Sequence, residues 1–418
     1  MSNKKLTDRI MLFLWISLIL ISGLKQVLVD LFGGVGYLGL SYALFAYFIF
    51  IYQKNNIKRK MNIYPFALFL FCYIFLLQVF QKGGLTYESM GVQFHLYVWN
   101  LITTLPYYFS ALIILQSADY DDLSFIKKVA GFEIIILVIS TIGILTIDPL
   151  ASKLTAVGGN ETEYFLLMGY GMVYGLATIL PFFLFDISRQ KKKGWKIVLF
   201  CLICISILMA SYTIAIFTAT IGVICYLLLK IKNQWVKIVS ITVTVAAILV
   251  LFVSGAMADL LEVLARMMPM DEVAKRLEQI ADAFRTGDTY DTTIRFDIYG
   301  DSWMEFLQHP ILGNIFVDEN SSSLWGHSTN LDILAGFGIF VFLLYISFPI
   351  NVFRYNYRCS SNLDFKATTI ASFIAFLFLS TFNPILSGTE IISLFILAPA
   401  VINSKEGSNG NNFINSPL

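Results

Sequence analysis

The sequence predicts an all-α polytopic membrane protein with about 12 transmembrane helices and one large extracytoplasmic loop containing short amphipathic helices. Hydrophobic residues make up 57% of the 418 residues, charged residues only 14%, and the mean hydropathy is +0.73. Soluble domains do not reach this composition. Apolar runs of about twenty residues, the length that a helix needs to cross a bilayer, recur along the chain.

These runs define a single polytopic domain over residues 1–403, and we expect the polar residues 404–418 to form a disordered cytoplasmic tail. No small-residue cleavage site follows the first run, so we expect it to remain in the protein as a helix. The seventh and eighth runs nearly fuse at residues 210–213, so the count depends on a turn there. The predicted spans are 10–31, 36–53, 62–80, 96–116, 129–147, 163–187, 197–211, 214–230, 237–256, 329–352, 367–383 and 389–403.

The basic residues indicate the orientation of these spans. Lys and Arg concentrate in cytoplasmic segments of membrane proteins. If the chain starts in the cytoplasm, 21 of its 29 basic residues fall on that side. We therefore expect both termini in the cytoplasm, and a location in the cytoplasmic (inner) membrane of a bacterium. The segments that carry these basic residues are 1–9, 54–61, 117–128, 188–196, 230–237, 353–366 and 404–418.

The largest polar interruption, residues 257–328, then falls outside. It contains 13 acidic and 5 basic residues, and a polar segment of this kind cannot lie in the lipid. Two apolar stripes at helical spacing predict two short amphipathic helices at the membrane surface. The first stripe ends at 286–288 and the second at His309-Pro310. The stripes are Val273, Leu277, Ile280, Phe284 and Phe296, Tyr299, Trp303, Phe306.

The five cysteines predict neither a disulfide framework nor a metal centre. Cys201 and Cys204 form a CxxC pair inside an apolar helix, without further Cys or His ligands nearby. We interpret them as helix-packing residues. No glycine-rich nucleotide loop stands out either, so we expect no metal, no cofactor and no nucleic-acid partner.

Two short motifs flank the end of the polar loop. The first contains Arg295, Tyr299 and Trp303, followed by His309-Pro310-Ile311-Leu312-Gly313. The second runs from Gly326-His327-Ser328-Thr329-Asn330 through Asp332 to the glycines of the next apolar run. Together they cover about 45 residues and resemble the signature of the O-antigen polymerase and ligase superfamily. The chain is most similar to a Wzy-type polymerase of polysaccharide repeat units.

The resemblance implies a metal-independent, GT-C-like glycosyltransferase. Such an enzyme joins oligosaccharide repeat units that are linked to undecaprenyl pyrophosphate. The product is an O-antigen, capsule or exopolysaccharide, and it is made at the outer face of the cytoplasmic membrane. Both donor and acceptor would be lipid-linked, in contact with membrane lipid, and a chain-length regulator and a flippase would be further partners. Arg295 would neutralise the departing diphosphate, because guanidinium offers bidentate contacts. His327 would be the general base for the acceptor hydroxyl.

One departure concerns a second phosphate-binding arginine. Ligases of this family tend to carry a Ser-Arg pair in the hairpin between two middle spans, whereas this chain has Ser211-Tyr212. Arg276, Arg266 or Lys25 are the candidates to replace that arginine. The departure weakens the ligase interpretation more than the polymerase interpretation.

Polar residues at the outer helix ends are candidates for sugar recognition, because amides and carboxylates hydrogen-bond hydroxyl groups. We expect this role for Asn330, Asp332, His95 and Glu161. Any solvent-facing helix end has residues of this kind, so their presence alone does not indicate a sugar site. For His327, the alternative to a general base is a histidine that caps the following helix. His309, which precedes Pro310, is expected to cap a helix.

Two other functions remain open alongside the polymerase. A ligase would transfer the finished glycan to a lipid or protein acceptor. A transporter of lipid-linked sugars would be expected to show internal repeats and broken, charge-bearing spans, and the sequence contains no convincing repeat.

Overall fold

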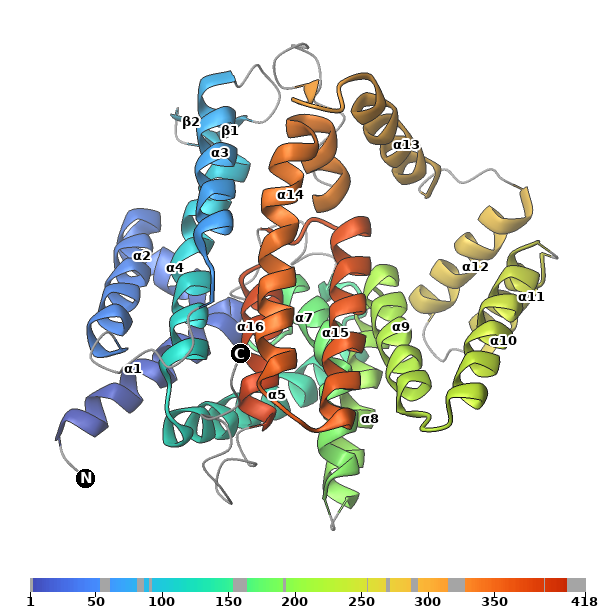
Figure 1. The fold of residues 1–418 in the computed structure, drawn as a ribbon, viewed down its shortest axis with the longest axis horizontal. Coiled ribbons are helices and arrows are strands. Elements are labelled where there is room, and N and C mark those ends of the chain that lie inside the picture. The colour runs from blue at the N-terminus through green and yellow to red at the C-terminus, as the bar shows by residue number, and fades with distance from the viewer. Residues whose placement is uncertain are drawn as a thin grey trace.

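The computed structural model describes residues 3–52, 61–80, 86–89, 92–152, 164–190, 193–253, 255–267, 271–286, 292–314, 328–386 and 388–403. Within these ranges the chain is almost entirely helical (Figure 1). The helices before the polar loop are α1 (Asn3–Leu20), α2 (Ser22–Tyr52), α3 (Tyr64–Phe80), α4 (Leu96–Ser117), α5 (Tyr120–Ile147), α7 (Tyr170–Ser188), α8 (Gly194–Met209), α9 (Thr213–Lys230) and α10 (Gln234–Val253). The polar loop contains α11 (Ala256–Met267), α12 (Asp271–Thr286) and α13 (Thr292–Gln308), and the last three helices are α14 (Thr329–Arg358), α15 (Leu363–Phe382) and α16 (Thr389–Asn403).

The helical class is confirmed, with one small addition. Strands β1 (Thr86–Ser89) and β2 (Val92–His95) form an antiparallel hairpin before α4, which pairs Thr86 with His95. This hairpin was not predicted, because four-residue strands leave almost no periodic signal in a sequence. Figure 1 shows the hairpin at the end of the bundle where α13 also lies.

Six helices among the described residues are long and apolar enough to cross a membrane, namely α2, α5, α7, α9, α14 and α15. Four further apolar helical segments are shorter, within α3, α4, α8 and α16. Many large apolar side chains on the peripheral helices are exposed, for example Trp235 and Val239 on α10 and Phe71 on α3. Such surfaces are unfavourable in water but suit contact with lipid. The chain is therefore a helical membrane protein.

The two longest helices are interrupted by glycine. Gly33 in α2 and Gly338 in α14 both have φ above +70°, so neither continues the helical backbone. L-residues with a Cβ rarely adopt that conformation. The break at Gly33 coincides with the predicted boundary between the first two spans. A second discontinuity, at Ile21 between α1 and α2, falls inside the predicted first span 10–31.

The centre of the bundle is formed by α7, α14, α15 and α16. Buried residues line nearly the whole of α7 and α16. Aromatic rings fill the contacts between helices, such as Phe66 stacked on Phe348 at 3.9 Å and Phe376 on Phe395 at 4.1 Å between ring centroids. Offset stacking of this kind adds to the apolar contact.

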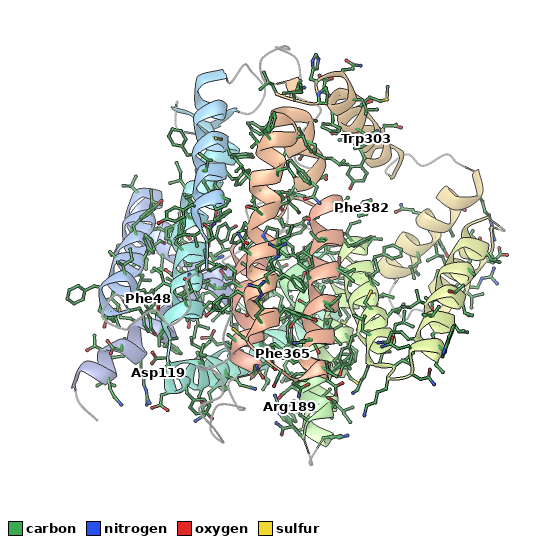
Figure 2. The ribbon with its side chains drawn as sticks, viewed as in Figure 1. Phe48, Asp119, Arg189, Trp303, Phe365 and Phe382 are labelled. Atoms are coloured by element: carbon green, nitrogen blue, oxygen red, sulfur yellow. The ribbon has the colours of Figure 1, made fainter. Side chains whose placement is uncertain are left out.

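The bundle has two chemically different ends, which we name by their residues. The loop end carries α13 and the start of α14, and the basic end carries Lys127, Arg189 and Lys196. Figure 2 shows Trp303 and Phe382 toward the loop end, and Asp119, Arg189 and Phe365 toward the basic end. Helix α7 ends at the basic end, and α5 and α8 begin there. The sequence predicts that these helix ends are cytoplasmic.

The polar loop holds three helices rather than the two that were predicted. Helices α12 and α13 match the two apolar stripes, and α12 ends at Thr286 as expected. The additional helix, α11, pairs with α12 through Ala258, Leu261 and Ala281. Arg285 of α12 binds Asp259 and Glu262 of α11, and these two hydrogen bonds raise the pKa of the guanidinium above its ordinary value.

Candidate active site at the loop end

The two sequence motifs are in direct contact at the loop end. The segment 310–313, which follows α13, lies in the break that Gly338 makes in α14. Pro310 O accepts a hydrogen bond from Ile339 N at 2.9 Å. A Cβ built on Gly313 would lie 2.3 Å from the carbonyl carbon of Gly336. Glycine is therefore required on both sides, since only backbones without side chains approach this closely.

Helix α13 is also fixed to the end of α15. The hydroxyl of Tyr299 donates a hydrogen bond to Phe382 O at 3.0 Å, and the two rings meet edge to face at 5.8 Å. Residues four apart in a helix share a face. Tyr299 therefore fixes one face of α13 against the end of α15.

The start of α14 is buried and held by the turn between α15 and α16. Ser328 caps the helix by accepting a hydrogen bond from Leu331 N at 3.0 Å, as serine at an N-cap commonly does. Thr329 N donates to Asn383 O at 3.2 Å, and the Thr329 hydroxyl accepts from Ile385 N at 2.8 Å. These bonds fix Ser328 and Thr329 at the start of α14.

A buried ion pair lies between the start of α16 and α2. Lys25 Nζ is 2.6 Å from Glu390 Oε1, and the two side chains are 19% and 9% exposed. Helix α7 provides the space for Glu390 with a G-x-x-x-G pattern, Gly171 and Gly175. A Cβ on Gly171 would lie 2.2 Å from Glu390 Oε2. Small residues at this spacing let membrane helices pack closely.

Hydroxyl groups extend the polar region from this ion pair. Tyr37 and Tyr107 are joined at 2.8 Å between hydroxyl oxygens, and Ser41 lies 3.0 Å from the Tyr107 hydroxyl. The charge of Glu390 is close enough to act electrostatically on the phenol of Tyr37, and the charge of Lys25 acts in the same way on the phenol of Tyr107. A charged pair and three hydroxyls inside an apolar bundle are a costly arrangement. Such groups are candidates for function.

The structure gives the predicted arginines different surroundings. Arg295 and Arg276 lie within α13 and α12, and their side chains are outside the described part of the structure. Arg266 ends α11 and is 78% exposed, with Glu262 one turn before it at 3.8 Å. That pairing along one helix is typical of a solvated surface. His95 ends β2, and its side chain is likewise not among those described.

Asn330 and Asp332 lie buried at the start of α14. The amide of Asn330 donates to the Thr381 hydroxyl at 2.8 Å, and an Asp332 carboxylate oxygen accepts from Ser328 N at 3.4 Å. Asn330 thus joins α14 to α15, and Asp332 bonds to the backbone at the start of its own helix, while their predicted contacts with sugar stay predictions. His327 and Glu161 lie outside the described residues, so their predicted roles stay predictions.

Three asparagines at the loop end have buried amide atoms without a partner in the described residues. The Oδ1 of Asn330, the Nδ2 of Asn383 and both amide atoms of Asn314 are buried and have no partner within the described ranges. Each such group carries a desolvation cost of about 1–3 kcal/mol until it finds one. These amides suit a polar partner, such as sugar hydroxyls, water or the neighbouring loop residues.

Ser211 and Tyr212 form a strained turn between α8 and α9. The resemblance would lead one to expect Ser-Arg at this place. Ser211 has φ of 59°, a conformation that is uncommon for serine. The Tyr212 ring packs against Tyr174 at 5.7 Å and Tyr170 at 5.3 Å between centroids. This hairpin presents aromatic surface instead of a guanidinium.

Sequence reasoning missed Glu390 and considered Lys25 only as a replacement for an arginine. The signal was present, because both residues lie at the edge of apolar runs and ionisable residues there are functional candidates. Their pairing across 365 residues of chain could not be read from the sequence.

No protein-family model and no curated protein matches this chain.

Proposed function

We propose that this protein is an integral membrane glycosyltransferase that polymerises undecaprenyl-pyrophosphate-linked oligosaccharide repeats into a surface polysaccharide. The observation that carries the proposal is the contact between the two motif segments at Gly313 and Gly338. The resemblance assigns catalytic groups to both segments, and a shared site requires them to meet.

The proposal includes a topology of twelve spans with both termini in the cytoplasm of a bacterium and the loop end outside. The charge bias of the sequence supports this orientation. The presence of Lys127, Arg189 and Lys196 at the end opposite α13 is consistent with it. Lipid-linked repeats would then reach the loop end from the outer leaflet.

In the proposed reaction, an acceptor hydroxyl attacks the anomeric carbon of the donor sugar. The new C–O bond forms as the bond to the diphosphate oxygen breaks, and the configuration inverts. His327 takes the hydroxyl proton, and Arg295 stabilises the additional negative charge that develops on the diphosphate oxygen as its bond to the sugar breaks. Neither step requires a metal ion. Binding of the sugars would use the buried amides of Asn314, Asn330 and Asn383.

Lys25 is the cation that best fits the place of the missing hairpin arginine. Its side chain is only 19% exposed, whereas that of Arg266 is 78% exposed. A cation in a poorly hydrated site interacts more strongly with a phosphate than one in water. In the proposed site Glu390 holds Lys25 in position until the donor binds.

The deciding experiment replaces His327 with alanine and follows the lipid-linked repeats. Inserted, folded protein that leaves single repeats on their carrier supports the proposal. Polymer of ordinary length and amount from the same variant contradicts it.

A transporter of lipid-linked sugars is the second candidate. The breaks at Gly33 and Gly338 and the buried Lys25–Glu390 pair are the kind of features that transporters use. Residues 310–313 fill the break at Gly338, however. This close packing favours a site that stays in place over a hinge that moves during transport. Reconstituted vesicles separate the alternatives: a polymerase joins repeats supplied in the outer leaflet, and a transporter moves them between leaflets without joining them. A ligase would instead consume polymer and a lipid or protein acceptor.

A further inference from the structure

A second buried acid lies away from the proposed active site. Glu133 is in α5, and only 5% of its surface is exposed. One carboxyl oxygen, Oε1, is 2.5 Å from the hydroxyl oxygen of Ser17 in α1. The other, Oε2, is buried and has no partner in the part of the chain that the structure describes. Burial of an ionised carboxylate is costly unless a cation or several donors replace its hydration.

The hydrogen bonds of Ser17 indicate the protonation state of this acid. The Ser17 hydroxyl lies 3.0 Å from Phe13 O, one turn earlier in α1, and serine hydroxyls in helices often donate to that carbonyl. A carbonyl oxygen can only accept, and a hydroxyl has a single hydrogen to donate. The Ser17 hydroxyl therefore accepts in its contact with Glu133. The donor is the carboxyl group of Glu133, which can donate only when it is protonated.

Ionisable groups on the surrounding helices give Glu133 no counter-charge within the described ranges. Helices α1, α8 and α16 pack against α5. The charged residues of α1 lie in 3–9, at least two turns before Ser17, and those of α5 itself, apart from Glu133, lie in 121–128. Helix α16 contributes Glu390, which is paired with Lys25. The ionisable residues of α8 are Lys196, Cys201 and Cys204, and the described structure shows no bond from them to Glu133.

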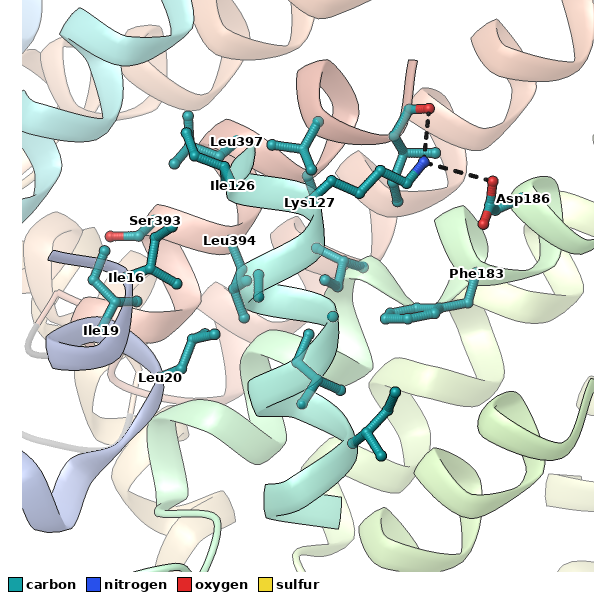
Figure 3. A pocket seen from close by; sticks show the side chains of 18 of the residues that line it. Ile16, Ile19, Leu20, Ile126, Lys127, Phe183, Asp186, Ser393, Leu394 and Leu397 are labelled. Atoms are coloured by element: carbon teal, nitrogen blue, oxygen red, sulfur yellow. Dashed lines mark hydrogen bonds and ion pairs between the residues drawn. The ribbon is translucent and has the colours of Figure 1, made fainter. Parts of the chain in front are cut away.

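One face of α5 near Glu133 borders an apolar cavity. The cavity has a volume of about 280 Å³, lies between α1, α5, α7, α8 and α16, and is lined by Ile134 (Figure 3). Lys127 and Asp186 lie at one edge of it. Lys127 Nζ is 3.7 Å from Asp186 Oδ1 and donates to Ile402 O at 3.4 Å, as Figure 3 shows. The Lys127 side chain thus extends toward α7 and α16 rather than toward the contact between Glu133 and Ser17.

We propose that Glu133 is a proton-binding site inside the membrane, and that its carboxylic acid joins α5 to α1 by donating a hydrogen bond to Ser17. The proton also accounts for the unpaired Oε2, because an uncharged carbonyl oxygen is far less costly to bury than an oxygen of a carboxylate. Ser17 O accepts from Ile21 N at 2.9 Å, at the discontinuity between α1 and α2. The protonated acid therefore holds the last turn of α1, just before the chain enters α2.

The test compares the same substitution at two buried acids. Glu133→Gln replaces a carboxylic acid with an uncharged group of the same shape, whereas Glu390→Gln removes a carboxylate that is paired with Lys25. Infrared difference spectra, wild type minus variant, are recorded on the purified full-length protein at neutral pH in water and in deuterium oxide. We expect Glu133→Gln to lose one carbonyl band of a protonated carboxyl group, which shifts in deuterium oxide. Glu390→Gln should lose carboxylate bands instead.

Two further measurements test the hydrogen bond and the proton. Ser17→Ala keeps the acid but removes its partner, so the carbonyl band should shift without disappearing. Glu133→Gln should melt close to the wild type at neutral pH, because an amide N–H can replace the acid O–H toward Ser17. Rising pH should lower the melting temperature of the wild type more than that of Glu133→Gln, since only the wild type has this proton to lose on unfolding.

Three outcomes would overturn the proposal. Loss of carboxylate bands in Glu133→Gln, as in Glu390→Gln, would show that Glu133 is ionised. An unchanged carbonyl band in Ser17→Ala would show that the acid is not bonded to Ser17. Equal falls in melting temperature with rising pH for the wild type and Glu133→Gln would show that folding does not depend on this proton.

Discussion

Gly313 and Gly338 each occupy a position where only hydrogen fits: Gly313 lies against the backbone of Gly336 and Phe337, and Gly338 lies against that of Ile311 and Gly313. A Cβ on Gly338 would lie 2.3 Å from Ile311 O and 2.8 Å from Gly313 N. Both residues also have φ above +70°. The polar loop and α14 are thus joined by two glycines that are 25 residues apart in the numbering of the chain.

Gly313→Ala and Gly338→Ala should each destabilise the protein strongly. The combination of positive φ and extended ψ at Gly338 is essentially restricted to glycine, and it costs another residue about 1–3 kcal/mol. The added methyl group would also meet backbone atoms, which cannot rotate away. We expect a clear fall in the melting temperature of the purified protein in detergent.

Gly33→Ala is the matched control for that prediction. Gly33 has the same φ of 72° as Gly313, but nothing lies within 4 Å of its Cβ. This variant should show only the conformational cost of a positive φ with extended ψ, about 1–3 kcal/mol. If Gly33→Ala and Gly313→Ala lower the melting temperature equally, the close packing at Gly313 contributes nothing.

His327→Ala should reduce polymer formation by about a hundredfold to ten-thousandfold, the typical effect of removing a general base. His309→Ala is the control. His309 lies 3.6 Å from Glu305 in the same helix and is partly exposed, so its removal should leave activity nearly unchanged. Polymer length and amount are measured by gel electrophoresis, and equal losses in the two variants would argue against His327 as the base.

Arg295→Lys should lose most of the activity although the charge is retained. A lysine ammonium cannot reproduce the bidentate contact of a guanidinium with a diphosphate. Initial rates with purified donor, together with its binding affinity, are the relevant measurements. Near-normal rates in this variant would leave Arg295 with a structural role only.

The Lys25–Glu390 pair can be tested by single and double replacement. Lys25→Met or Glu390→Gln alone leaves one partner buried without its counter-charge, at a cost of roughly 3 kcal/mol, the lower end for buried pairs. The double variant should recover much of the lost stability. If Lys25 binds the donor phosphate, the double variant stays inactive while its melting temperature recovers. Recovery of both properties would make the pair purely structural.

The topology predicts opposite labelling of two exposed positions. In a cysteine-free background, Asp301→Cys in α13 should react with an impermeant thiol reagent in intact cells, or in spheroplasts if an outer membrane is present. Lys193→Cys, just before α8, should react only after permeabilisation. Both side chains are exposed in the structure, so accessibility within the protein is matched. The reverse pattern would place the loop end in the cytoplasm and remove the proposed site from the outer face.

Local patterns predicted the helices well. The stripe from Val273 to Phe284 became α12, and the one from Phe296 to Phe306 became α13. Both predictions depend on the spacing of apolar residues within one or two helical turns, and this spacing can be read directly from the sequence. The hairpin 86–95 and helix α11 were missed, because one is too short for periodicity and the other continues an apolar run.

The sequence by itself determined the membrane class, the charge bias and the segments that carry the two motifs, since each follows from composition or from neighbours along the chain. Only the tertiary structure decided which distant segments meet. The insertion of residues 310–313 at Gly338, the pairing of Lys25 with Glu390 and the cavity beside Lys127 and Asp186 all join residues from different helices. These contacts are set by close packing of whole helices, and no local periodicity encodes the partner that a helix face will find.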